Sequence, residues 1–290
     1  MMYILLGVSI VLAVAKSSLM NNFGKKNIDG NIAIILFNLF TYIMATIIQL
    51  CFGASFSKEL TTILPATGYA IFLLLMQACS LKAMSCGPMA LSSLFVMYGL
   101  IIPSLAGPIF WHEKISIMQV IGIILMLAAI YISSATEQST GEVSDGISKK
   151  WFLYAFLSLI FSGLVGLFEK VHQTGPSADE VGAFLLTAFT ILVVLNGLIV
   201  LVSYFKNHNV NVNKGAVICA VLTGIISAFY SRVNLILAGG LDSMVYYPIS
   251  SGGAILLTVI VAGLFFREKF TKRSITGIIV GGISIILLGL

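Results

Sequence analysis

Long apolar runs separated by short polar stretches make up almost the whole chain. Ten of these runs have about the 20 residues that a helix needs to cross a hydrocarbon core roughly 30 Å thick. They predict helices over residues 2–23, 30–53, 63–85, 89–110, 115–135, 151–169, 180–204, 215–238, 243–266 and 273–290. Strands of a membrane barrel would be alternating segments of about half this length. The pattern therefore predicts an all-α integral membrane protein with ten transmembrane helices.

Composition agrees with a lipid environment. Hydrophobic residues make up 59% of the chain and charged residues 9%, whereas a soluble domain carries roughly 25% charged residues. So few charges cannot cover a soluble globule, and so apolar a chain is not a disordered one. The net charge of +5 is spread along the sequence and does not predict nucleic-acid binding. We expect a multi-pass protein of the cell membrane, with the lipid bilayer as a partner.

The two halves of the chain repeat one another. Residues 136–150 contain no large aromatic side chain and predict a flexible linker between two units, 1–135 and 151–290, of five predicted helices each. A shift of 155 residues superposes Trp111–Lys114 on Phe266–Lys269 and Gly122–Ile124 on Gly277–Ile279. Because five is odd, the second unit must cross the membrane in the opposite direction to the first. This predicts an inverted-topology repeat, which is a common plan of secondary transporters.

These segments also resemble a known family. The resemblance is carried by Ala83–Ser92, Pro103, Trp111–Lys114, Gln119–Gly122 and the second copy over 239–290. They look like the EamA family of the drug/metabolite transporter superfamily. The resemblance covers essentially the whole chain, and it implies a substrate cavity at the centre, between the halves. It also implies that the first four helices of each half line that cavity.

Two positions depart from the patterns of that superfamily. The first predicted helix, Tyr3–Met20, is similar to the small multidrug resistance branch, whose members carry a membrane-embedded glutamate there. Ala13 occupies that position in this chain, which argues against antiport of cationic drugs and protons. Asn38 stands where many EamA-like proteins have an arginine, which argues for a different substrate.

The expected function is secondary transport, with export of a small organic metabolite by alternating access through the central cavity. No HExxH, GxSxG or Walker motif is present, and His112, His172 and His208 fall singly in predicted loops. We therefore expect no enzyme activity, no cofactor and no metal site. Two alternatives stay open: a non-transporting membrane scaffold or channel, and an intramembrane enzyme. Since one chain contains both halves, a monomer can form the site.

Acidic side chains all fall in predicted loops or at predicted helix ends. A carboxylate relay through the membrane therefore has no obvious members. Glu169, at the end of the predicted helix 151–169, is the nearest candidate. We interpret it as a surface charge beside Lys170.

Basic and polar side chains inside the predicted helices are the candidate substrate-binding groups. Arg232 lies about 10 Å from the end of its helix at 1.5 Å per residue, and intramembrane charge usually faces a cavity. At the 155-residue offset it pairs with Gln77. We hypothesise that Arg232 faces the central cavity and meets an anionic or strongly accepting substrate group. The candidate set is Arg232, Gln77, Lys16, Asn38, Tyr230, Asn234, Tyr98 and Tyr246, and we expect no catalytic residues.

Loop charges give a testable orientation. Connections on one side contain ten Lys or Arg residues, and those on the other side contain only Lys58, Lys114 and Lys170. The positive-inside rule then places both termini outside the cell, whereas the family resemblance implies cytoplasmic termini. A cysteine introduced into the 136–150 linker, in a variant without the four native cysteines, should resist an impermeant reagent in intact cells if the charges decide. Labelling of that cysteine would contradict the charge-based orientation.

Overall fold

The computed structural model describes residues 2–25, 31–86, 92, 95–96, 98–114, 116–134, 149–205, 214–265 and 272–288. Within these residues the chain forms ten α-helices, and the fold is all-α. The helices are α1 (Met2–Lys25), α2 (Asn31–Cys51), α3 (Leu60–Cys86), α5 (Ile101–Phe110), α6 (Ile117–Ser134), α7 (Lys149–Gln173), α8 (Val181–Phe205), α9 (Lys214–Gly240), α10 (Ser243–Phe265) and α11 (Lys272–Leu288).

Most helix boundaries lie within a few residues of the predicted ones. The largest difference at a C-terminus is in α7, which continues four residues beyond the predicted end at 169. The C-terminal part of the predicted helix 89–110 corresponds to α5, which ends at Phe110. The linker up to residue 148 and the second Glu-Lys turn, at 268–269, lie outside the described residues.

In the described part of the chain, five helices are long and apolar enough to cross a membrane: Ile34–Cys51, Leu60–Ala83, Lys149–Gln173, Val181–Ser203 and Gly215–Gly240. Shorter apolar stretches occur in α1, α5, α6 and α11. Large apolar side chains are exposed on the outside of the bundle, among them Leu60, Ile117 and Phe205, each more than three-quarters exposed. A helix satisfies its own backbone hydrogen bonds, which suits it to lipid. These features suggest a multi-pass membrane protein.

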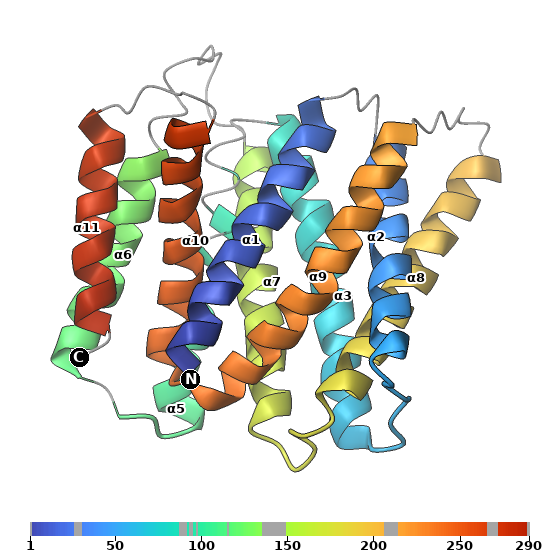
Figure 1. The fold of residues 1–290 in the computed structure, drawn as a ribbon, viewed down its shortest axis with the longest axis horizontal. Helices are drawn as coiled ribbons and strands as arrows, with labels where there is room; N and C mark the ends of the chain where they lie inside the picture. The colour runs from blue at the N-terminus through green and yellow to red at the C-terminus, as the bar shows by residue number, and fades with distance from the viewer. Residues whose placement is uncertain are drawn as a thin grey trace.

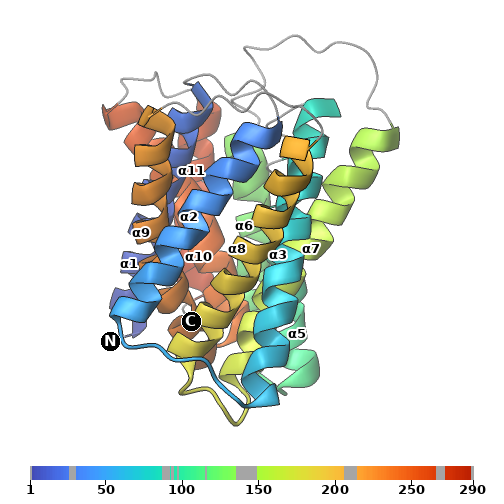
Figure 2. The same cartoon turned by 90° about the vertical axis from the view of Figure 1, so that its right-hand side faces the viewer.

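The helices run side by side between two faces (Figures 1 and 2). The helices α6 and α11 form one edge of the bundle, α2 and α8 form the other, and α1, α7, α9 and α10 lie between them (Figure 1). The N-terminus and the described C-terminal end lie at the same face (Figure 1), which we call the terminal face.

Most contacts between the two halves of the chain occur in matching pairs, and the contact of α6 with α10 is an exception. The helix α3 packs on α7 as α1 packs on α9, and α2 packs on α9 as α3 packs on α8. Likewise α1 contacts α10 as α5 contacts α7. The helices α2 and α8, α5 and α10, and α6 and α11 contact each other directly. These contacts are preserved when α1, α2, α3, α5 and α6 are exchanged with α7, α8, α9, α10 and α11.

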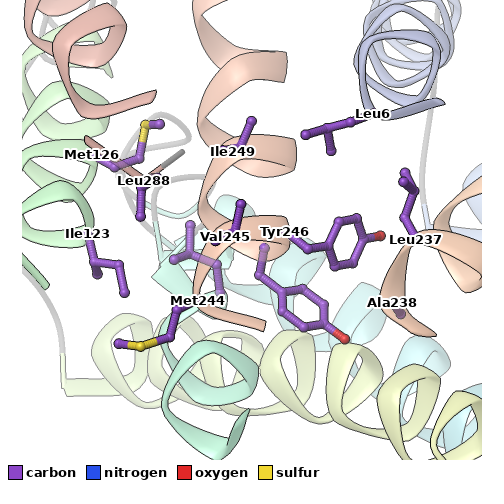
Figure 3. Packing of buried hydrophobic residues seen from close by; sticks show 12 residues of the cluster. Leu6, Ile123, Met126, Leu237, Ala238, Met244, Val245, Tyr246, Ile249 and Leu288 are labelled. Atoms are coloured by element: carbon purple, nitrogen blue, oxygen red, sulfur yellow. The ribbon is translucent and has the colours of Figure 1, made fainter. Parts of the chain in front are cut away.

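Two apolar clusters flank the middle of the bundle. One surrounds α10 and includes Leu6, Tyr246 and Leu288 (Figure 3). The other joins α2, α3, α8 and α9 and includes Tyr42 and Tyr69. In each cluster the tyrosines bring hydroxyl groups into an otherwise apolar interior.

One buried ion pair ties three segments together at the terminal face. Lys170 Nζ of α7 lies 2.8 Å from Glu113 Oε1, and both side chains are less than a tenth exposed. Glu113 also accepts hydrogen bonds from the backbone N–H and hydroxyl of Ser243, at the start of α10. Lys170 donates a further hydrogen bond to the carbonyl oxygen of Leu241. We call this group of four residues the terminal-face clamp.

The clamp generates a stability prediction. Glu113→Ala would leave the Lys170 ammonium buried beside one carbonyl, and removing one partner of a buried pair costs roughly 3–5 kcal/mol. The free energy of unfolding in detergent, measured by denaturant titration, should fall by about that amount. Lys114→Ala is the matched control, because Lys114 is the neighbouring residue and is exposed. Equal stability of the two variants would contradict the structural role of the clamp.

Candidate functional site

A group of polar side chains from five helices meets in the interior of the bundle. Helices α1 and α3 belong to the first half of the chain, and α7, α9 and α10 to the second. The members of this central polar cluster are Ser9, Lys16, Tyr69, Glu169, Tyr230, Ser231, Asn234 and Tyr246. Four of them, Lys16, Tyr230, Asn234 and Tyr246, are candidates from the sequence.

The side of the cluster between α1 and α9 is held by paired contacts. Lys16 Nζ lies 5.4 Å from the centroid of the Tyr230 ring, a geometry in which a cation is attracted by the ring face. One turn further along α9, the Asn234 side chain interacts with the Tyr230 hydroxyl. The Oδ1 atom of Asn234 accepts a hydrogen bond from the Ser9 hydroxyl of α1. The charge of Lys16 therefore lies against an aromatic face whose own position is fixed.

Glu169 is inside the protein, so its interpretation as a surface charge is wrong. The residue is 8% exposed because α7 continues to Gln173 and places Glu169 in the body of the helix. Its carboxyl group interacts electrostatically with Lys16. Within the described part of the chain, no side chain forms an ion pair with Glu169 or donates a hydrogen bond to it. The cluster thus contains a buried acidic group that has no ion pair or hydrogen bond with the described side chains.

Tyrosine side chains surround Glu169 from three helices. Tyr69 of α3, Tyr230 of α9 and Tyr246 of α10 are all close enough to interact electrostatically with its carboxyl group. The Tyr69 hydroxyl interacts with the Ser231 side chain. Tyr246 is 2% exposed and points from α10 toward the end of α9 that carries Leu237 (Figure 3).

Asn38 and Gln77 form a second polar group, between α2 and α3. Asn38 Nδ2 donates to Gln77 Oε1 over 3.3 Å, and Gln77 Nε2 donates to the Tyr42 hydroxyl over 2.7 Å. Tyr42 interacts electrostatically with Tyr69, which belongs to the central polar cluster. The structure therefore brings these two candidates together and connects them to the cluster through Tyr42.

Arg232 and Tyr98 have other neighbours. Arg232 Nη1 donates a hydrogen bond of 3.1 Å to Gln49 Oε1 of α2, and its guanidinium carbon lies 5.1 Å from the Phe52 ring centroid. These contacts direct Arg232 toward the end of α2, while Tyr230 and Asn234 face α1. The Tyr98 hydroxyl donates to the Leu127 carbonyl oxygen of α6 over 3.0 Å. Neither side chain contacts the Lys16–Glu169 pair.

The histidine that the sequence assigns to a loop after helix 151–169 is also buried. His172 lies in the last turn of α7, is 1% exposed, and packs on Phe184 with ring centroids 4.5 Å apart. Its Nδ1 atom contacts Gln173 Nε2, and its Nε2 atom has no hydrogen-bond partner. Among the residues that the structure describes, no three possible metal ligands are grouped together.

The residues that sequence reasoning missed are Ser9, Tyr42, Tyr69, Glu169 and Ser231. One signal could have found Glu169. At the 155-residue offset it falls on Val14, two residues from Lys16, so α1 and α7 carry opposite charges at nearly equivalent places. The tyrosines have no such signal, because a tyrosine in an apolar run is typical of any membrane helix.

Polar contacts also join the halves at the terminal face. The Thr62 hydroxyl of α3 donates to Glu180 Oε2 over 2.6 Å, and the Thr61 and Ser177 hydroxyls lie 2.6 Å apart. Hydrogen bonds from Ser57 and Thr62 lower the pKa of the Glu180 carboxyl group. The contact with Glu180 is therefore fully present at neutral pH and weakens only as the pH falls through that lowered pKa.

Comparisons with known proteins give the fold and no more. No family model matches the chain, and no curated protein matches it. One solved structure, described only as the crystal structure of a protein, is similar with a TM-score of 0.76 at 12% sequence identity. The match covers 100% of this chain and 98% of that one. At this identity the likeness concerns the fold alone, and that fold extends over the whole chain.

Proposed function

We propose that the chain is a secondary transporter, similar to the EamA family of the drug/metabolite transporter superfamily, that exports a small organic metabolite across the cell membrane. It works by alternating access through a central site between two inverted five-helix repeats, 1–135 and 151–290. The observation that carries the proposal is the electrostatic interaction of the half-buried Lys16 with the buried Glu169, close to tyrosines from three helices. Ionisable side chains inside a membrane bundle are costly, and they usually mark a substrate or ion pathway.

The arrangement of the helices supports the two-repeat plan. Most contacts between the halves are preserved when each helix of one half is exchanged with its counterpart, as expected of two inverted copies, and the contact of α6 with α10 is an exception. The central polar cluster draws side chains from both halves, which is where repeat-built transporters place their sites.

Alternating access requires that the halves separate at one face at a time. At the terminal face they are joined by the hydrogen bonds of Thr61 and Thr62 to Ser177 and Glu180. The proposal assigns these contacts to the state closed at that face. Hydroxyl and carboxyl groups suit such a role, because water can replace each hydrogen bond when the contact opens.

Solute counterflow into proteoliposomes tests the function. Vesicles loaded in turn with unlabelled alanine, succinate, putrescine or uridine receive a trace of the same labelled compound outside. At least one compound should accumulate transiently, with a rate that saturates, because a carrier exchanges one bound solute for another. Protein-free vesicles provide the control. Flux that rises linearly with concentration would indicate a channel, and absence of counterflow with all four compounds would contradict the proposal.

Substitution of Arg232 provides a second test of the function, and substitution of its hydrogen-bond partner Gln49 provides the matched control. Arg232→Gln should leave membrane insertion and folding intact. If the guanidinium group meets the substrate, this variant should reduce the counterflow rate at least tenfold. Arg232→Lys should recover only part of the counterflow rate, because an ammonium group lacks the planar fork of a guanidinium group. Gln49→Leu removes the described hydrogen-bond partner of Arg232 and should retain most of the transport. Unchanged transport in Arg232→Gln would assign Arg232 a structural role.

A further inference from the structure

We propose that Lys16 and Glu169 form a binding site that takes a small organic carboxylate together with one proton. The inference rests on the proposed function, because it names the substrate class of the same central site. It follows from a difference between the contacts of the two groups: the Lys16 ammonium lies over the Tyr230 ring, whereas the Glu169 carboxyl group has no hydrogen bond or ion pair among the described residues.

Lys16 retains one favourable contact when its acidic partner is removed. Its ammonium lies 5.4 Å from the centroid of the Tyr230 ring, and a cation over an aromatic face is stabilised by about 0.5–2 kcal/mol. Asn234 and Ser9 hold the Tyr230 side of this contact in place. An ammonium group donates three hydrogen bonds and accepts none, so the ligand that completes it is an acceptor, as a carboxylate is.

Glu169 depends on Lys16 to remain ionised. In the described part of the chain, its carboxyl group receives no hydrogen bond, and Lys16 is the charge with which it interacts favourably. Lys170, the next residue, is already engaged by Glu113 and the Leu241 carbonyl oxygen. When another anion takes Lys16, Glu169 becomes an unpaired buried carboxylate, and such a group takes up a proton rather than remain charged.

Among the residues that the structure describes, no other titratable group near Glu169 can substitute for this exchange. The groups that face it are Lys16 from α1, Tyr69 from α3, Tyr230 from α9, and Tyr246 and Tyr247 from α10. The helix α5, which also packs on α7, has no titratable side chain over Ile101–Phe110. Tyrosines are ordinarily neutral at pH 7, and Tyr247 already donates its hydroxyl to the Gly166 carbonyl oxygen. Glu169 is therefore the group that changes charge.

The charges balance through a complete cycle. At a pH where Glu169 is ionised in the empty site, the charges of the Lys16 ammonium and the Glu169 carboxylate cancel. A monovalent carboxylate accepts hydrogen bonds from Lys16 Nζ, and a proton from the same aqueous side binds a carboxyl oxygen of Glu169, so the loaded site is again neutral. Release on the other side frees the anion and the proton, and the original pair forms again. Efflux of an accumulated organic acid would then carry one proton outward with each anion.

Calorimetry of the full-length protein in nanodiscs tests the inference, with lactate and benzoate as probes. Titrations in two carboxylate-free buffers of different ionisation enthalpy give the number of protons taken up per bound anion. We expect about one proton at a pH where Glu169 is ionised in the empty site. The apparent Kd should then rise about tenfold per pH unit, because one proton binds with each anion.

Variants separate the two roles. Glu169→Gln should bind the same anions without proton uptake, with no dependence on pH, and more tightly than the wild type at high pH. Lys16→Gln leaves Glu169 without its partner and can fail to fold, so the double variant Lys16→Gln/Glu169→Gln is included, and it should bind neither probe. Lys82→Gln is the matched control, because Lys82 also lies 5.4 Å from a tyrosine ring, that of Tyr154, but is exposed. It should behave as the wild type does.

Several results would overturn the inference. These are anion binding without proton uptake, loss of anion binding in Glu169→Gln, unaltered anion binding in the double variant, and failure of both probes to bind. Binding of glycine without proton exchange, in place of the anions, would assign the site to zwitterions and equally overturn it. If counterflow succeeds with another solute while neither anion binds, the transport function stands and only this inference fails.

Discussion

In a membrane bundle, a polar group that leaves water must find its partner inside the protein, because the hydrocarbon offers none. The sequence has only 11 acidic residues, and two neighbouring positions on α7 show opposite ways of meeting this requirement. Lys170 is fully engaged by Glu113 and the Leu241 carbonyl oxygen, which fixes α7 against the α5–α6 turn and the start of α10. Glu169, one residue earlier, has only the more distant charge of Lys16 among the residues that the structure describes. The first arrangement provides rigidity, and the second leaves an acidic group that can exchange partners.

That contrast links the packing to the proposed transport. Apolar clusters on both sides of the bundle hold the helices in place, and the clamp at the terminal face anchors the helix that carries Glu169. The groups around Glu169 are tyrosines, which offer ring faces and hydroxyls without adding charge. A ligand that enters this region therefore meets one cation and one acid, and the electrostatic balance between them selects what is bound. Helices from both halves contribute, so relative movement of the halves changes access to the same groups.

The sequence predicted the helices well and the site in part. Helix ends follow from turn residues and charges, and the start of α10 at Ser243 was placed correctly, directly after Asp242. The end of α9 was predicted two residues early, because Gly239 and Gly240, which interrupt the apolar pattern, still belong to the helix. The same rule failed at Glu169 and Lys170. Their partners, Lys16 and Glu113, are distant in the sequence. The two adjacent charges were therefore interpreted as residues at the membrane surface, whereas both lie within α7. Lys16, Tyr230 and Asn234 were found because charged and amide groups are rare inside apolar helices. Arg232 fits the same rule, yet its side chain projects toward Gln49 and Phe52, and the direction of a side chain depends on neighbouring helices that periodicity does not identify.

The central claim is that Glu169 exchanges its charge when a ligand takes Lys16. Infrared difference spectroscopy measures this directly, because a protonated carboxylic acid has a carbonyl-stretching band that a carboxylate lacks. Addition of lactate to the protein in lipid should produce that band in the wild type, with loss of carboxylate absorption, and the band should be absent in Glu169→Gln. The band's appearance in both proteins, or in neither despite lactate binding, would contradict the account.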